Sequence, residues 1–187
     1  YETEQTDKYT QLSGQMVDIL FVVDDSGSMA EEQANLAQNF NALMQEAIAW
    51  GTEFQMGVVT TDIKKDSASG RLQGNPKIVT PGASSESQFK SNVQVGDSGA
   101  GEQEAGLEAA SQALSMPLIY EGTNTSCTAD SDCESYGPGL SCTNGKCAGW
   151  NAGFLREDAA LELVFVSDEE DQSPGPLNFY IDFFKSI

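Results

Sequence analysis

Two stretches of the chain are almost continuously apolar and end in acidic residues. Residues 17–23 (VDILFVV) are mostly β-branched or aromatic and stop at Asp24, and residues 161–166 (LELVFV) run into Asp168. A short run of this composition is typical of a strand buried on both faces, as in a parallel sheet. Ligands of such sheets bind at the carboxyl ends of the strands, so both aspartates lie where a site is expected.

Weaker patterns predict the other elements of the fold. Residues 54–60 and 77–80 are expected to form two further strands, and apolar positions at helical spacing predict helices over 30–50, 107–114 and 177–187. Strands that alternate with helices favour a layered α/β fold with a mainly parallel sheet.

The chain of 187 residues is interpreted as one domain over 17–187 that follows a polar lead-in at 1–16. Within this domain, residues 121–151 change character, because they are rich in Gly, Ser, Asn, Asp and Cys and carry few large apolar side chains. Such a segment cannot bury a core of its own and needs covalent staples. We therefore expect it to be an insert.

All four cysteines lie in this insert, with the spacing C-x5-C-x8-C-x4-C from Cys127 to Cys147. An even and local cluster fits a disulfide-stapled loop, and hence an oxidising compartment outside the cytosol. A zinc site with four Cys ligands is the competing interpretation, although the C-x2-C pair that zinc knuckles usually contain is missing.

The charge and one missing residue type exclude several functions. Acidic residues outnumber basic ones by 29 to 9, for a net charge of −20, and such a surface repels DNA, RNA and anionic membranes. The chain has no histidine, which excludes triads with a His base and His-ligated zinc. No apolar run reaches the roughly 18 residues of a membrane span. We expect no nucleic-acid partner, no transmembrane segment and no enzymatic activity.

The loop after the first apolar run reads Asp24-Asp25-Ser26-Gly27-Ser28-Met29. Its carboxylate and hydroxyl oxygens are hard ligands, which suit Mg²⁺, Ca²⁺ or Mn²⁺. Residues 24, 26 and 28 alternate, so a tight turn that Gly27 permits can direct all three side chains to one point. The loop therefore predicts a divalent-cation site, and Asp168 at the end of the other apolar run is expected to complete it.

The D-x-S-x-S motif between a predicted buried strand and a predicted helix resembles the metal-ion-dependent adhesion site of von Willebrand factor A and integrin inserted domains. The resemblance covers roughly residues 17–120 and 155–187, with the cysteine segment as an insert. It implies a doubly wound, Rossmann-like α/β fold with helices on both faces of a mainly parallel sheet.

The resemblance also implies a role for each residue of the site. Two serine hydroxyls touch the metal in this family, which assigns Ser26 and Ser28 as direct ligands and Asp24 as a direct or water-bridged one. A further aspartate follows a later strand of the family's sheet, and Asp168 matches it here.

The sequence departs from the family in the middle loop, where the family supplies a threonine. The stretch 96–106 contains no threonine, and Glu104 stands where it would fall. We expect Glu104 to act as a ligand instead, with Ser98 as the fallback. An additional carboxylate makes the site more negative, so it holds a cation more tightly but weakens the attraction of that cation for an anionic ligand.

The function that the resemblance implies is adhesion or recognition, in which a carboxylate of a protein or cell-surface ligand completes the metal ion. The loops and the insert together look like secreted or lipid-anchored bacterial members of the family, which implies an extracellular, periplasmic or cell-surface location. The alternative is a structural role, in which the metal only braces the loops and a partner binds elsewhere, such as at the insert.

The sequences around Cys133 and Cys147 in the insert resemble those of small extracellular cysteine-rich modules. In those modules the first cysteine pairs with the third and the second with the fourth. This implies the pairs Cys127–Cys142 and Cys133–Cys147, with nested pairing as the alternative.

The sheet of the family has more strands than the four candidates found here, and its chain continues with further strands after the helix that matches 177–187. We therefore expect that residues 17–187 lack the C-terminal strands of the domain. An unpaired apolar edge strand promotes aggregation, so a second chain or a further part of this one is expected to complete the sheet.

Overall fold

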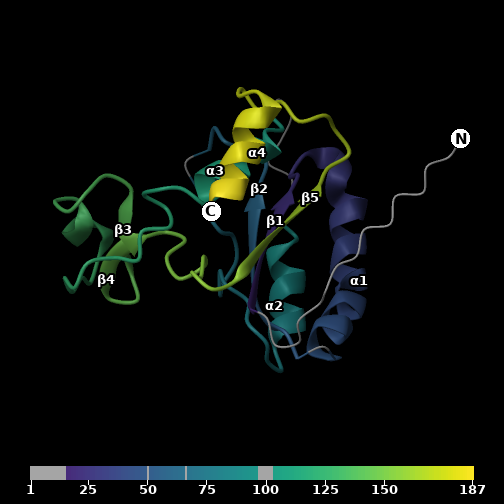
Figure 1. Ribbon diagram of the computed structural model, residues 1–187, viewed down its shortest axis with the longest axis horizontal. Coiled ribbons are helices and arrows are strands. Elements are labelled where there is room, and N and C mark those ends of the chain that lie inside the picture. The colour runs from purple at the N-terminus through teal and green to yellow at the C-terminus, as the bar shows by residue number, and fades with distance from the viewer. Residues whose placement is uncertain (1–15, 50, 66, 97–102) are drawn as a thin grey trace, which may run out of the picture.

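The computed structural model describes residues 16–49, 51–65, 67–96 and 103–187, without the side chains of 41–49. The predicted lead-in, except Met16, and the fallback ligand Ser98 lie outside the described residues. Figure 1 shows a mixed α/β arrangement, in which helices pack against a central sheet and the cysteine-rich segment lies to one side. In the described part of the chain, no helix has the length and apolar character that a membrane span requires.

Three parallel strands form the central sheet in the order β2-β1-β5, with β1 at Met16–Val23, β2 at Glu53–Thr60 and β5 at Ala160–Val166. The sequence predicts each of them to within one residue. The central strand β1 is the most continuously apolar, and residues 20–23 are at most 1% exposed. A strand with a neighbour on both sides and helices on both faces has no polar surroundings, which explains this composition.

The strand predicted at 77–80 is wrong. Val79 forms only an isolated antiparallel bridge with Met56, with N–H···O distances of 2.8 and 2.9 Å. Pro76 and Pro81 bracket the segment, and neither can donate a ladder hydrogen bond. The helix α2 (Ser85–Asn92) that follows was not predicted, because Phe89 is its only large buried apolar side chain.

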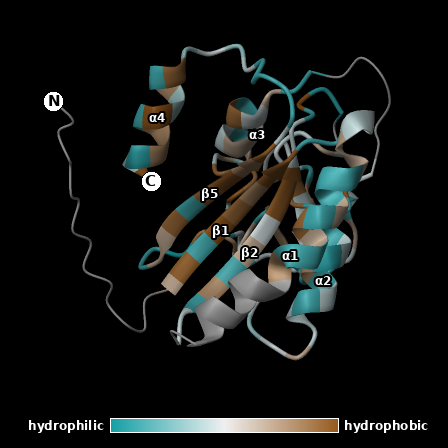
Figure 2. Cartoon of the chain, turned by 90° about the vertical axis from the view of Figure 1, so that its right-hand side faces the viewer, coloured by the Kyte–Doolittle hydropathy of each residue, from teal (hydrophilic) through white to brown (hydrophobic). Residues whose placement is uncertain are grey.

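Helices lie on both faces of the sheet, as Figure 2 shows. The helices α1 (Ala30–Ala49) and α2 cover one face, where Phe89 stacks on Phe40 at 3.7 Å between ring centroids and meets Phe21 edge-on at 4.7 Å. The helices α3 (Gly106–Ala113) and α4 (Leu177–Ser186) cover the other face, where Leu20 and Val22 are buried. Successive residues of β1 thus alternate between two cores. The predicted helices α1, α3 and α4 are confirmed.

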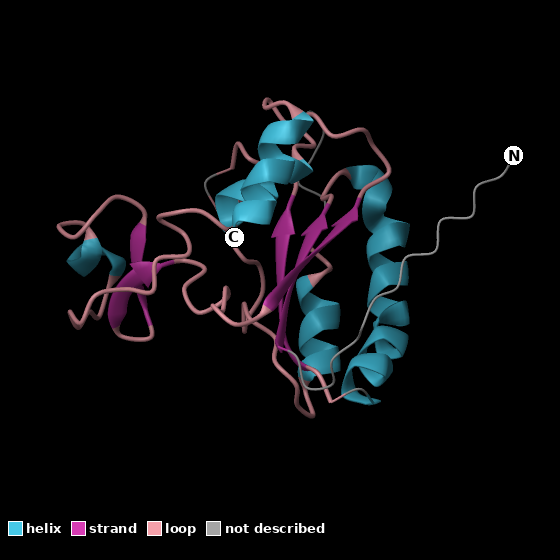
Figure 3. Ribbon diagram, viewed as in Figure 1, coloured by secondary structure: helices cyan, strands magenta, loops and turns pink. Residues whose placement is uncertain are grey.

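The insert folds around a short antiparallel hairpin, β3 (Leu140–Thr143) and β4 (Lys146–Gly149), preceded by the 3-10 turn η2 (Asp130–Cys133). Figure 3 shows this hairpin apart from the central sheet. Its two-residue turn, Asn144-Gly145, has φ values of 52° and 76°, which is the conformation that Asn-Gly turns favour.

The disulfides of the insert are Cys127–Cys142 and Cys133–Cys147. The interleaved pairing is confirmed, and nested pairing and the zinc interpretation are wrong, because all four cysteines are in these two bonds. The cysteines form a small core, in which Cys133 and Cys147 are fully buried. Sulfur thus supplies the buried contacts that the composition of the insert cannot.

Residues Trp150 and Asn151 tie the insert to the main domain. The buried Asn151 amide accepts a hydrogen bond from the Leu72 N–H (2.9 Å) and donates to the carbonyls of Gly70 (2.8 Å) and Ala113 (2.9 Å). The Trp150 indole N–H donates to the Leu72 carbonyl at 2.9 Å. One side chain therefore bonds three backbone groups, two in the loop at 70–72 and one at the end of α3, at the base of the insert.

The amino end of the central strand is held by an ion pair. Arg156 Nε lies 2.7 Å from Oδ1 of the fully buried Asp18, and its backbone N–H donates to Oδ2 at 2.7 Å. The Arg156 guanidinium also donates to the Val17 carbonyl at 3.0 Å. These contacts tie the amino end of β1 to the segment that precedes β5.

The outer strands of the sheet are β2 and β5. The expectation that another segment or chain adds strands to this sheet stays a prediction.

Candidate metal centre

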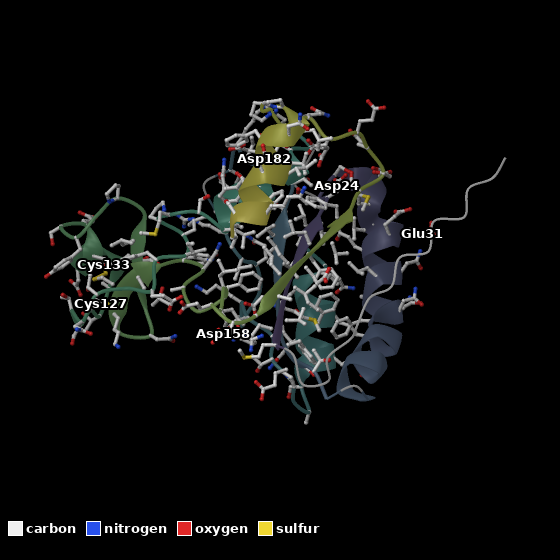
Figure 4. The ribbon with its side chains drawn as sticks, viewed as in Figure 1. Asp24, Glu31, Cys127, Cys133, Asp158 and Asp182 are labelled. Carbon is white, nitrogen blue, oxygen red and sulfur yellow. A yellow bond between two sulfur atoms is a disulfide. The ribbon has the colours of Figure 1, made fainter. Side chains whose placement is uncertain are left out.

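A crevice is expected at the carboxyl ends of β1 and β5, because the chain leaves these two neighbouring strands toward opposite faces. After β1 it enters a 3-10 turn (Gly27–Met29) and α1 on one face, whereas after β5 it leads to α4 on the other. Such a divergence between adjacent parallel strands is where α/β proteins place their ligands. Figure 4 shows Asp24 at this end of the sheet.

Asp24 is fully buried and is held by hydrogen bonds to both carboxylate oxygens. Oδ1 accepts the Ser26 N–H at 2.8 Å, and Oδ2 accepts the Ser167 hydroxyl at 2.7 Å. The Gln33 amide donates to the Asp24 carbonyl at 2.9 Å, and the Asp24 N–H donates to the Val166 carbonyl at 3.0 Å. The Asp24 carboxylate is therefore held by its own turn and by the loop after β5, and its backbone is held by α1 and β5.

The two serines form a bridge between this turn and the loop after β5. Ser26 Oγ lies 3.1 Å from Ser28 Oγ, and the Ser28 hydroxyl donates to Asp168 Oδ1 at 3.2 Å. The fully buried Met29 anchors the turn that presents them. Neighbouring oxygens around an octahedral Mg²⁺ with ~2.1 Å bonds lie about 3 Å apart, so these spacings fit adjacent ligands of one cation.

Glu104 approaches Asp24 from the segment that leads into α3. It is only 4% exposed, pairs with Asp62 in an isolated β-bridge, and its carboxylate accepts a hydrogen bond from the Thr61 hydroxyl. Its side chain is also hydrogen-bonded to that of Asp24. Burial, reinforced by the negative charges of Asp24 and Asp25, raises the pKa of Glu104 to about 7, while the Thr61 hydroxyl opposes this rise.

The neighbouring carboxyl responds in the opposite direction. Burial of Asp24 acts to raise its pKa, but hydrogen bonds from Ser167, from Ser26 and from Glu104 together outweigh burial and hold the pKa below its ordinary value. Asp24 and Glu104 thus behave as a buried pair in which, below about pH 7, Asp24 is ionised and Glu104 keeps a proton. A divalent cation can supply the same neutralising charge that this proton does.

The structure brings the five predicted site residues to one edge of the sheet, but their carboxylates do not converge on a single point. Within the described residues, the only three Cys, Asp or Glu ligand atoms that lie within 4.8 Å of one another belong to the disulfide-bonded Cys127, Cys133 and Cys147. A cation here therefore needs the hydroxyls of Ser26 and Ser28 between Asp24 and Asp168.

Two residues of the arrangement were missed by the sequence analysis. Thr61 and Ser167 donate to the carboxylates of Glu104 and Asp24, respectively. Both follow the last residue of a parallel strand, and this position was the signal that could have identified them.

Comparison with known proteins identifies no relative, because no protein-family model, curated protein or solved structure matches the chain. The resemblance to von Willebrand factor A domains rests on the residues quoted above and stays a prediction.

Proposed function

We propose that the chain is a recognition module with a doubly wound fold of the von Willebrand factor A type. It binds Mg²⁺, Ca²⁺ or Mn²⁺ at the carboxyl ends of β1 and β5, and the ion binds an acidic group of a protein or cell-surface ligand. The observation that carries this proposal is the row of oxygens in which Ser26 and Ser28 lie between Asp24 and Asp168.

The exposure of these residues supports an ion that a partner can reach. Asp24 and Glu104 are buried behind the ion, where Ser167 and Thr61 orient them. Ser28 and Asp168 are exposed, so the outer side of an ion held by them faces solvent. A carboxylate of a partner can then take the place of water in its coordination shell.

The two disulfides support an oxidising location for this module, because such bonds persist outside the reducing cytosol. We accordingly propose that it acts in the extracellular space, in the periplasm or on a cell surface.

A structural role is the second candidate, and the buried Glu104 is the observation that favours it. With Asp24 and Asp168, Glu104 brings three carboxyl groups of the chain itself to the edge of the sheet that would hold the ion, although they do not converge on a single point. Their summed charge exceeds that of a divalent cation, which weakens attraction for a further anion. In this second proposal the ion stabilises the loops, and a partner binds elsewhere, such as at the insert.

Thermal unfolding with and without Mg²⁺ or Ca²⁺ tests metal binding, since a ligand of the folded state raises the midpoint by mass action. We expect the rise in the wild type and in Asp158→Asn, but not in Asp168→Asn. Asp158 is exposed near the start of β5, so its substitution removes the same charge at the far end of the strand. An unchanged wild-type midpoint at millimolar metal would exclude the site.

Terbium luminescence separates recognition from bracing, because its lifetimes in H₂O and D₂O report how many waters remain on the bound ion. Recognition requires coordinated waters that added acetate displaces. A terbium ion that binds without any coordinated water would instead support the structural role.

A further inference from the structure

A cleft of about 300 Å³ lies beside the candidate metal centre, between β5, the start of α3 and the loop that follows β5. Val22, Leu107 and Phe165 give it apolar walls, and Glu104, Glu169 and Asp171 add carboxyl groups. We propose that this cleft binds a lysine or arginine side chain of a protein partner. This proposal rests on the proposed function in one respect: the same partner is taken to supply the acidic group that binds the metal ion.

The apolar walls suit the aliphatic part of such a side chain. Phe165 is 44% exposed although it lies in a strand of the central sheet. A Cβ added at Gly106 would lie 3.3 Å from the Phe165 ring and 3.5 Å from Val22, so the glycine keeps this space open. Lysine and arginine bury their methylene groups against apolar surfaces of this kind, and an exposed aromatic face attracts their charge.

The charges around the cleft select a cation. Glu169 and Asp171 are exposed carboxylates in its lining, Glu104 is a buried carboxyl group, and no residue that lines the cleft is basic. The amino end of α3 would otherwise favour an anion, but the Leu107 N–H already donates to Asp171 Oδ1 at 3.1 Å and the Glu108 N–H to Ser173 Oγ at 2.9 Å. These amides are therefore satisfied within the chain, and the carboxylates determine the sign of the local potential.

The cleft is continuous with the candidate metal centre. Ser167 and Glu104 line the cleft, and the same two side chains are hydrogen-bonded to Asp24. One short segment of a partner can thus place a basic side chain in the cleft and an acidic one at the cation. The net charge of −20 also accelerates the approach of a basic partner.

The test uses three small probes that share a four-carbon skeleton: butylammonium, butanol and butyrate. Each is titrated into the whole isotopically labelled chain at low salt, with chelator present, while the backbone amide signals of Leu107, Phe165 and Glu169 are followed by NMR. We expect butylammonium alone to give saturable shifts at these positions. A neutral or anionic probe that binds equally well overturns the proposal, as does the absence of saturable shifts with butylammonium.

Matched variants locate the charge that matters. Glu169→Gln is expected to weaken butylammonium binding by about 2- to 5-fold, which is the range for a solvent-accessible ion pair. Glu162→Gln removes one exposed carboxylate from β5 outside the cleft and should leave the affinity unchanged. Equal weakening by both variants would mean that only the overall negative field attracts the probe, which also overturns the proposal.

The outcome is independent of the metal site, because chelator is present throughout. A Mg²⁺ or Ca²⁺ titration of separate, chelator-free samples reports on the proposed function. Metal binding without butylammonium binding refutes the cleft proposal alone. Butylammonium binding without metal binding retains the cleft as a site for a basic side chain and refutes its link to a metal ion.

Discussion

Replacement of Glu104 by glutamine should abolish a pH dependence of stability that the wild-type chain shows in the absence of divalent metal. The pKa of this carboxyl is raised from an ordinary 4.5 to about 7 in the folded chain. The folded state therefore holds a proton that the unfolded state has lost between these two pH values. The free energy of unfolding should fall as pH rises through this window and become constant above it.

The size of the effect follows from the pKa difference. A difference of about 2.5, at about 1.36 kcal/mol for each unit of pKa, corresponds to about 3 kcal/mol over the full window. Between pH 5 and pH 8 this leaves a loss of roughly 2 to 3 kcal/mol in the free energy of unfolding. Glutamine resembles the protonated acid in shape and can still accept the Thr61 hydrogen bond, so Glu104→Gln should lack this dependence.

Urea unfolding in chelator-treated buffer at pH 5, 6, 7 and 8 measures this slope in the wild type and in Glu104→Gln. Glu162→Gln serves as the control, because it removes an exposed carboxylate from β5 and should keep the wild-type slope. Excess Mg²⁺ or Ca²⁺ should stabilise the wild type more at pH 8 than at pH 5, since the ion replaces the proton. A wild-type slope that persists in Glu104→Gln would refute the assignment of this pH dependence to the Asp24–Glu104 pair.

Three further predictions concern stability. Arg156→Ala leaves the buried Asp18 carboxylate without its ion pair, and urea unfolding should show that the free energy of unfolding falls by about 3–5 kcal/mol. Lys90→Ala serves as the control. It removes the more exposed ion pair with Glu86 within α2 and should lower the free energy of unfolding by less than about 1 kcal/mol. Asn151→Ala removes the partner of three backbone groups and should cost at least about 2 kcal/mol in the same assay. Reduction of both disulfides should make the backbone amides of the β3–β4 hairpin exchange fast with solvent. The amides of β1 should still exchange slowly, because β1 is held by apolar burial. Fast exchange in β1 as well would contradict this prediction.

Elements whose surroundings are the same along their whole length could be predicted from the amino-acid sequence. The run 17–23 can only be a buried strand, because every residue that it places toward either face must be covered by apolar neighbours. The four cysteines, in a segment without other large buried side chains, likewise identified the stapled insert. Asp24, Ser26, Ser28 and Asp168 were found because they follow strand ends, which mark the open edge of a parallel sheet, whereas Glu104 was assigned only from the family resemblance.

Elements that depend on distant partners could not be obtained in this way. The segment 77–80 has the composition of a strand, but its contact with Met56 is a single bridge. The helix α2 is mostly polar and is held by one aromatic residue, Phe89, whose partners Phe21 and Phe40 come from two other elements. Local pattern carries no information on which neighbour completes such an element.

The tertiary structure alone decided how the carboxyl groups of the site share charge. The family resemblance places Glu104 at the same site as Asp24, but nothing in the sequence indicates that the two carboxyl groups are hydrogen-bonded to each other or that Thr61 and Ser167 orient them. Ionisation depends on burial and on the distance between charges, and both arise only when β1, β2 and β5 align their carboxyl ends. The sequence identified five of the oxygen-bearing side chains at this edge but not Thr61 and Ser167, and the packing of the sheet determined which carboxyl group keeps a proton.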